Sequence, residues 1–137
     1  MIRKSILLRC PPDEAFELFT GRISEWWPAT HRPTKDPASE LFIEPAGRFF
    51  ERARDGREIE LGRVVLWQAP RRIELDFYVG TSAAQPTAVN VTFAAEDKGT
   101  RVTVHHRAGP ASEELWKGRA PLFEKSWEAV LAALVDL

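Results

Sequence analysis

Three short runs of alternating apolar and polar residues, followed by one apolar helical stripe, constrain the fold of this chain most. The runs cover 72–77, 89–93 and 101–106, and turn-forming residues separate them. Such alternation places every second side chain on one face of a strand. The stripe has the spacing of one side of a helix and consists of Phe123, Trp127, Val130, Leu131 and Leu134. The sequence therefore predicts an antiparallel sheet with one face covered by a C-terminal helix.

The first half of the chain predicts more strands and two short helical segments. Residues 2–10 are expected to form a strand, and the prolines and acids that follow indicate a short helix ending near Phe19. A second helical turn is expected at 23–27, before a proline-rich loop at 28–38. Three more strands are expected at 41–43, 48–52 and 58–67, with Asp55-Gly56 as a hairpin turn.

The C-terminal segment predicts two helices, because Pro121 lacks the N–H that an interior helical residue donates. A short helix is expected near 111–117 and the main helix from a break or kink to near Val135. Residues 80–86 are small and polar, which favours a loop. The chain is thus expected to form a single α+β domain over 1–137, with six or seven antiparallel strands.

Composition and charge exclude several classes of partner. The net charge of −1 gives no reason to expect nucleic acid binding. No stretch approaches the roughly 20 apolar residues that span a bilayer, so no membrane association is predicted, and a cytoplasmic location is expected. One cysteine allows no internal disulfide or Cys-based zinc site, and the three histidines lack ligand spacing, so we expect no metal. No Gly-x-Ser-x-Gly elbow or phosphate-binding loop is present, so no catalytic residue is assigned.

His106 is the strongest single candidate for a role in binding or catalysis. The alternation places it with Val102 and Val104 on the face toward the helix. A histidine there could orient a polar group of a ligand or transfer a proton near neutral pH. The plainer interpretation is a partly buried imidazole that is hydrogen-bonded to the backbone.

Glu51 is a second candidate, and its direction depends on the strand register. If Glu51 faces inward, it needs a partner such as Arg48, Arg63 or His106, because an unpaired buried carboxylate is costly. If Phe50 faces inward instead, Glu51 is a solvated surface acid. A bulge after Gly47 would decide between the two.

Trp26 and Trp27 are adjacent at the end of a helical turn, so both are not expected to point into the core. One should pack, while the other lies at the rim of a cavity beside the 28–38 loop. It would act there as a gate or simply as a partly exposed hydrophobic plug.

Several local strings stand in a characteristic order along the chain: Glu25-Trp26-Trp27-Pro28, Gly47-Arg48-Phe49-Phe50-Glu51, Gly62-Arg63-Val64, Gly99-Thr100-Arg101-Val102-Thr103-Val104 and Trp127 with Val130-Leu131. These strings and the order of elements resemble the START-like (SRPBCC) superfamily, and in particular the bacterial branch similar to a heat-shock chaperone ATPase activator. Ala46 and Ser126 depart from the glycines usual in that branch.

The resemblance implies a helix-grip fold: a curved antiparallel sheet around a long C-terminal helix, with two short helices after the first strand. It also implies an internal cavity and no cofactor. Such a fold does not define an activity. The expected ligand-binding residues are Trp26, Trp27, Phe50, Glu51, Leu75, Phe77, Val91, Phe93, Val104, His106, Phe123 and Trp127.

Three functions are compatible with this sequence. The first is binding of a small hydrophobic or aromatic molecule, which makes enzymatic activity uncertain and not favoured. The second is a polyketide cyclase or aromatase-like enzyme that would use His106 and Glu51. The third is a co-chaperone-type protein-interaction domain, which the resemblance alone suggests. A homodimer could form through the 80–86 segment or an exposed tryptophan.

Overall fold

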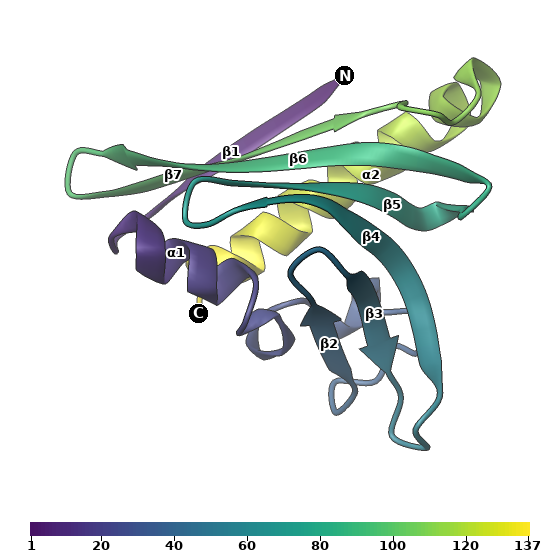
Figure 1. The fold of residues 1–137 in the computed structure, drawn as a ribbon, viewed down its shortest axis with the longest axis horizontal. Coiled ribbons are helices and arrows are strands. Elements are labelled where there is room, and N and C mark those ends of the chain that lie inside the picture. The colour runs from purple at the N-terminus through teal and green to yellow at the C-terminus, as the bar shows by residue number, and fades with distance from the viewer.

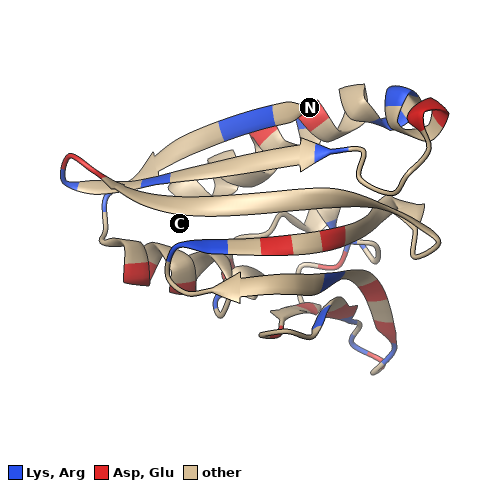
Figure 2. Ribbon diagram, turned by 45° about the horizontal axis from the view of Figure 1, so that its top comes forward, with Lys and Arg blue, Asp and Glu red and all other residues tan.

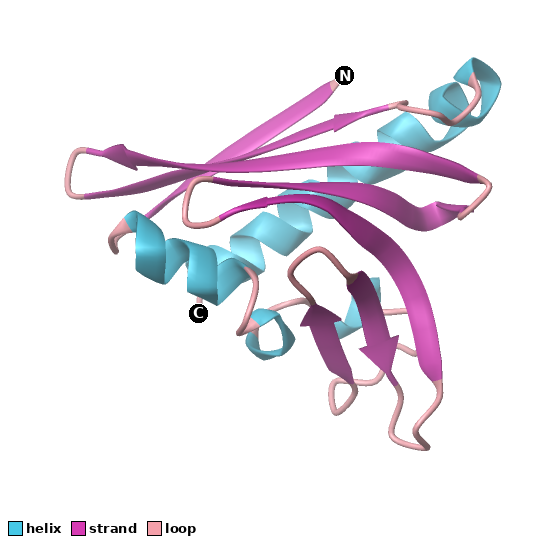
Figure 3. Cartoon of the chain, in the orientation of Figure 1, coloured by secondary structure: helices cyan, strands magenta, loops and turns pink.

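A curled antiparallel sheet wraps one long helix in the computed structural model, which describes all of residues 1–137 (Figure 1). Three short helical segments complete the fold (Figure 3). The elements are, in order, β1 (Ile2–Leu8), α1 (Pro12–Phe19), the 3-10 turns η1 (Ile23–Glu25) and η2 (Ala29–His31), β2 (Glu40–Ile43), β3 (Arg48–Arg52), β4 (Glu58–Gln68), β5 (Arg72–Ser82), β6 (Gln85–Glu96), β7 (Gly99–Arg107) and α2 (Glu113–Val135). The predicted α+β helix-grip is confirmed.

All seven strands lie in one sheet of order β1-β7-β6-β5-β4-β3-β2, and every neighbouring pair is antiparallel. The three alternating runs of the sequence form parts of β5, β6 and β7. Their registers align the apolar positions, for example Ile73 opposite Val91 and Val91 opposite Val104. These residues are buried on the face that α2 covers. The predicted inward face of the sheet is therefore confirmed.

Helix α2 buries the predicted stripe from Phe123 to Leu134. Ser112 caps its N-terminus, and the Ser112 hydroxyl accepts a hydrogen bond from the Leu115 backbone N–H at 3.1 Å. The expected pair of helices on either side of Pro121 is wrong, because one helix runs from Glu113 to Val135. Pro121 lies on the exposed side, where water can satisfy the carbonyl that loses its intrahelical donor.

The expected loop over 80–86 is also wrong. Strand β5 continues to Ser82 and β6 starts at Gln85, so the two strands form a long hairpin with a short connection. The pairing shifts between Phe77 and Ser82, and Gly80 lies within this irregularity with φ +75°. Glycine adopts this conformation without the steric cost that a side chain brings.

Trp26 and Trp27 are both buried, with 5% and 7% of their surfaces exposed, so the expectation that only one would pack is wrong. The helical turn η1 ends at Glu25, and the next residues no longer follow helical spacing. Trp26 packs against Phe19, whereas Trp27 packs against Phe49 and Trp127. Their indole N–H groups donate to backbone carbonyls, and these hydrogen bonds replace the ones to water that burial removes.

Acidic and basic residues are interspersed along the strands and helices and do not gather on one face (Figure 2). Each of several surface arginines pairs with a nearby carboxylate, for example Arg48 with Glu58 and Glu60. Neither helix has the combination of length and hydropathy that crossing a bilayer requires.

Candidate functional site

An aromatic pocket of about 160 Å³ lies between α2, the end of β5 and the segment that carries η2. Four large rings line it: Trp27, Phe77, Phe123 and Trp127. The Trp27 and Phe77 rings each have their centre 5.9 Å from the Trp127 ring, and Trp27 stands nearly perpendicular to it. Such contacts hold the rings in fixed positions. The pocket is therefore a gap in the aromatic part of the core.

The rim of the pocket carries its few polar groups. His31, Arg119 and Ser126 line it beside the aliphatic residues Val79, Leu122 and Val130. Leu122 is 54% exposed and Arg119 is also exposed, so this side reaches solvent. No carboxylate lines the pocket. An apolar interior with a small basic rim suits an apolar molecule that bears a polar group at one end.

Four of the expected ligand-binding residues, namely Trp27, Phe77, Phe123 and Trp127, line this pocket. The others lie elsewhere. Trp26 packs against Phe19 in the core. The sheet residues Leu75, Val91, Phe93 and Val104 are buried and fill the core beside the pocket without lining it.

His106 lies behind the pocket wall and is completely buried. Its Nδ1 accepts a hydrogen bond of 3.0 Å from the indole N–H of Trp127, and its Nε2 lies 2.7 Å from the hydroxyl of Thr87. The indole can only donate, so Nδ1 is unprotonated and the network assigns the proton to Nε2. The imidazole is thus hydrogen-bonded to two side chains, where the plainer interpretation expected the backbone.

The environment of His106 keeps the imidazole neutral. Burial lowers its pKa from 6.5 to about 4. Phe123 lies over the ring, with centres 4.4 Å apart, and Trp116 and Phe77 pack around its edges. Both ring nitrogens are engaged, so His106 positions Trp127 and is not presented to a molecule in the pocket.

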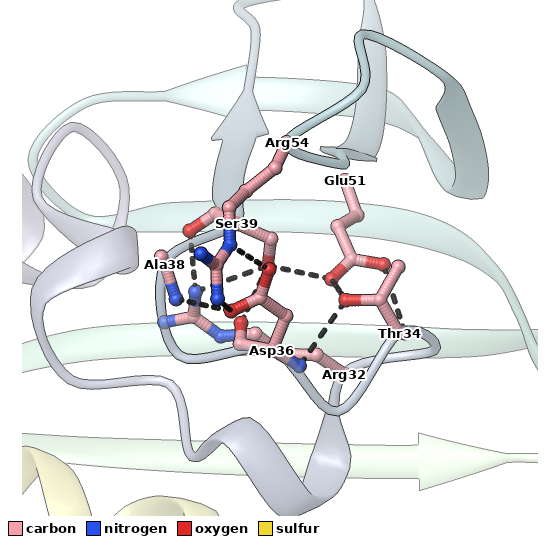
Figure 4. Close-up of polar contacts among 7 residues, drawn as sticks. All are labelled: Arg32, Thr34, Asp36, Ala38, Ser39, Glu51 and Arg54. Atoms are coloured by element: carbon pink, nitrogen blue, oxygen red, sulfur yellow. Dashed lines mark hydrogen bonds and ion pairs between the residues drawn. The ribbon is translucent and has the colours of Figure 1, made fainter.

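Glu51 is buried, and a segment of the 28–39 loop surrounds its carboxylate (Figure 4). The backbone N–H of Thr34 donates to Oε1 at 3.2 Å, and the Thr34 hydroxyl donates to Oε2 at 2.7 Å. The Ser39 hydroxyl lies 2.6 Å from Oε2. The carboxylate therefore anchors the loop and does not line the pocket.

Arg32 is the second buried charge of this loop and is only 3% exposed. Its guanidinium donates to the carbonyls of Ser24, Trp27 and Ser39 at 2.6–3.1 Å. Burial lowers the pKa of Arg32, while the Glu51 carboxylate acts in the opposite direction. Arg32 and Glu51 together fix the backbone on both sides of η2, and so place Trp27 and His31 at the pocket.

An exposed ion pair closes the outer side of the same loop. Arg54 donates to both oxygens of Asp36, at 2.6 and 3.0 Å, and the Ala38 N–H donates to Asp36 Oδ1 at 2.9 Å (Figure 4). The hydrogen bond from Arg54 is the main reason why the pKa of Asp36 is lowered. The loop is consequently held from its inner and its outer side.

Phe50 points to the opposite face of β3 from Phe49 and Glu51. Its ring stacks on Phe42 of β2, and the Arg48 guanidinium lies 3.9 Å from its centre. The β3–β4 pairing shifts between Phe49 and Phe50 because β4 carries one extra residue, Leu61, so β3 itself alternates regularly and the bulge considered after Gly47 does not set its register. Phe50 therefore belongs to a cation–aromatic cluster outside the pocket.

The sequence did not assign Arg119 and Ser126 to the site, and it indicated His31 only as a loop residue that could close over a pocket mouth. Arg119 lies four residues before Phe123 and Ser126 directly precedes Trp127, so helical spacing from the apolar stripe could have indicated both. His31 carried no such signal, because the position of a loop residue depends on the Arg32 and Glu51 contacts. No group of three or more His, Cys, Asp or Glu side chains could hold a metal ion.

The fold and the pocket define the chain as a helix-grip protein of the START-like type. The family model described as "Activator of Hsp90 ATPase homolog 1-like protein" matches residues 9–137, so the chain belongs to that family. No curated protein matches it.

Two solved structures of about one quarter identity cover nearly the whole chain. The self-sacrificing resistance protein CalC from Micromonospora echinospora is 25% identical with a TM-score of 0.77, covering 98% of this chain and 91% of CalC. The anthrahydroquino-γ-pyrone synthase Txn09, solved in complex with SUM, is 28% identical with a TM-score of 0.66, covering 98% of this chain and 94% of Txn09. Protein NE0264 from Nitrosomonas europaea shares the fold at 13% identity, with a TM-score of 0.67 and coverage of 98% and 91%.

Proposed function

We propose that this protein binds a small aromatic or hydrophobic molecule in the pocket between α2 and β5. The observation that carries the proposal is a pocket of about 160 Å³ that is lined by four aromatic side chains and opens to solvent. A packed interior has few voids larger than a water molecule. A gap of this size that reaches the surface beside Leu122 is therefore suited to a ligand.

The volume sets the size of the ligand. A protein cavity of about 150 Å³ lined by apolar side chains accommodates benzene, whereas pockets for drug-sized molecules span about 300–1,000 Å³. The pocket thus fits one aromatic ring with small substituents. A larger molecule would have to project past Arg119 and Leu122 into solvent.

Ligand binding can be tested with benzene, indole, p-cresol and 2-naphthol as probes, with thermal unfolding and tryptophan fluorescence as readouts. Trp27 and Trp127 line the pocket, so an occupied pocket should change the emission. The variant Ser126→Phe places a ring into the pocket and should abolish binding. Ala129→Phe adds the same ring on the exposed side of α2 and is the matched control.

We expect at least one single-ring probe to raise the unfolding temperature of the wild type and of Ala129→Phe, but not of Ser126→Phe. The proposal fails if no probe stabilises the wild type. It also fails if Ser126→Phe binds as tightly as the control, since the ligand would then occupy another place.

A cyclase-like activity is the second candidate, and the 28% identity with the Txn09 synthase over 98% of this chain favours it. His31 would be the proton-transferring group, because it lines the pocket while His106 and Glu51 do not. Burial, and next the charge of Lys35, lower the pKa of His31, which favours a neutral imidazole that can accept a proton. If a polyketide substrate is turned over, His31→Ala should abolish turnover and retain binding; unchanged turnover would remove His31 from this role.

The remaining expectations concern location and assembly. A cytoplasmic location and a homodimer formed through the 80–86 segment stay predictions from the sequence, as does the protein-interaction alternative. The oligomeric state can be checked by sedimentation of the purified chain.

A further inference from the structure

The pocket mouth carries a positive charge that has no partner within the chain. Arg119 lines the mouth and forms none of the ion pairs of the structure. Its Cδ lies against Gly80, 3.9 Å from the position that a Cβ on that residue would occupy. The stem of Arg119 therefore lies beside Gly80 at the end of β5, close to Phe123.

The charged groups around the mouth leave Arg119 without a neutralising partner. Glu114 lines a neighbouring surface groove together with Arg119, but the two form no ion pair. The only other titratable residue that lines the pocket is His31, and Lys35 is close enough to it to influence its protonation. The nearest acid on the 28–39 loop, Asp36, is already paired with Arg54. Glu51 is buried with its oxygens occupied by Thr34 and Ser39. A basic mouth above an uncharged interior favours a ligand with one negative end.

We propose that the ligand is a single-ring aromatic carboxylate, with its ring between Phe77, Phe123 and Trp127 and its carboxylate on the guanidinium of Arg119. This inference rests on the proposed binding function and specifies its ligand class. The volume admits one ring. A carboxylate at the mouth keeps contact with water, so its burial incurs little desolvation cost.

Carboxylate fits this mouth better than other anions do. The planar guanidinium donates two parallel hydrogen bonds that match the two oxygens of a carboxylate. A phosphate group would favour several cations or a cluster of backbone N–H groups, whereas Arg119 is the only guanidinium at the mouth. The orientation of the ligand follows directly, with the charged end toward solvent and the ring toward Trp127.

Benzoate, benzamide and benzamidine test the inference, because they share nearly the same shape and carry charges of −1, 0 and +1. In isothermal titration at about 50 mM salt, benzoate should bind most tightly, benzamide less tightly and benzamidine most weakly. Arg119→Gln should weaken benzoate about two- to five-fold and leave benzamide unchanged, since an ion pair at an exposed position contributes on that scale. Raising the salt to 500 mM should weaken benzoate alone.

Two further variants show whether benzoate pairs with the guanidinium of Arg119 or only responds to the overall charge of α2. Lys125→Gln removes the same charge from an exposed position of α2 that does not line the pocket, and should not change benzoate binding. Arg119→Lys keeps the charge but cannot donate the two parallel hydrogen bonds of a guanidinium. It should therefore bind benzoate more tightly than Arg119→Gln and less tightly than the wild type.

The outcomes distinguish the inference from the function on which it rests. Equal affinities for benzoate and benzamide, with no effect of Arg119→Gln, would overturn the carboxylate and leave aromatic binding intact. Tightest binding of benzamidine would also overturn it. Failure of all three probes to bind, together with failure of the neutral aromatic probes, would overturn both. Tenfold tighter binding of 2-naphthoate than of benzoate would overturn the single-ring limit.

Discussion

The indole N–H of Trp127 on α2 donates a 3.0 Å hydrogen bond to Nδ1 of His106 on β7. On its other side, His106 is hydrogen-bonded through Nε2 to the hydroxyl of Thr87 on β6, which lies 3.4 Å from the Phe77 carbonyl on β5. This chain of polar groups connects the helix to three strands through the core. It also fixes the indole that forms one wall of the pocket, so pocket shape and core stability depend on the same imidazole.

Replacing His106 with alanine should lower the free energy of unfolding by about 3–5 kcal/mol. The substitution leaves a cavity under Phe123 and removes the partners of the Trp127 indole and the Thr87 hydroxyl, both of which are buried. Urea unfolding monitored by fluorescence measures the change.

His105→Ala is the matched control for this substitution. His105 is the neighbouring residue on β7 and lies on the opposite, partly exposed face. Its loss should change the free energy of unfolding by only about 0.5 kcal/mol. Similar losses for the two variants would contradict a special role of His106.

The low pKa of His106 predicts that the protein loses stability in mild acid. The unfolded imidazole binds a proton near pH 6.5 and the folded one only near pH 4. Between these values the unfolded state holds more protons, so stability is complete above pH 6.5 and declines as the pH falls toward 4. From pH 6.5 to 5, before most carboxylates titrate, the decline should be roughly 2 kcal/mol in urea unfolding.

The variant His106→Gln separates this effect from other titrations. A glutamine can accept a hydrogen bond from Trp127 and donate one to Thr87, yet it does not titrate. The part of the pH dependence that remains belongs to His31, whose pKa is also lowered by burial, and to the carboxylates. A slope equal to that of the wild type would exclude His106 as the source.

The sheet and the helix could be predicted from the sequence because each has one face in the core. Alternation in 72–77 and 101–106 specifies which side chains point inward, and the spacing from Phe123 to Leu134 specifies the buried side of α2. Pro121 was misleading, because an exposed position tolerates the loss of one hydrogen bond.

The site was less predictable, because a pocket is the part of the core that side chains leave unfilled. The apolar pattern does not distinguish Val91, which packs, from Phe77, which lines the gap. The two faces of β3 carry Phe49 with Glu51 and Phe50 with Arg52, so the local pattern does not reveal which face is inward. The position of His31 depends on contacts between residues far apart in the chain.

The loop anchored by Glu51 should be sensitive to loss of one negative charge. Glu51→Gln replaces a charged acceptor of three hydrogen bonds with an amide that has one acceptor oxygen. We expect the free energy of unfolding to fall by about 1–3 kcal/mol, and the Thr34 amide to exchange hydrogen faster in the native state.

The comparison for Glu51 is Glu40→Gln, since Glu40 is exposed on the neighbouring strand β2. That change should leave both the stability and the exchange of the Thr34 amide nearly unaltered. If Glu51→Gln leaves Thr34 as protected as in the wild type, the carboxylate does not hold the loop.

Gly80 should control both the strain of β5 and the shape of the pocket. At φ +75°, an alanine costs about 1–2 kcal/mol of stability, and its Cβ would lie 3.2 Å from Cε1 of Phe123. We expect Gly80→Ala to displace Phe123 and to weaken binding of single-ring aromatic probes several-fold.

Gly56→Ala provides the control, because Gly56 has φ +91° and a Cβ there would meet nothing within 4 Å. The two variants should lose comparable stability from backbone strain, measured by thermal unfolding, whereas only Gly80→Ala should lose affinity in titration calorimetry. Equal affinities of both variants for the probe would mean that the ring of Phe123 is not a wall of the binding site.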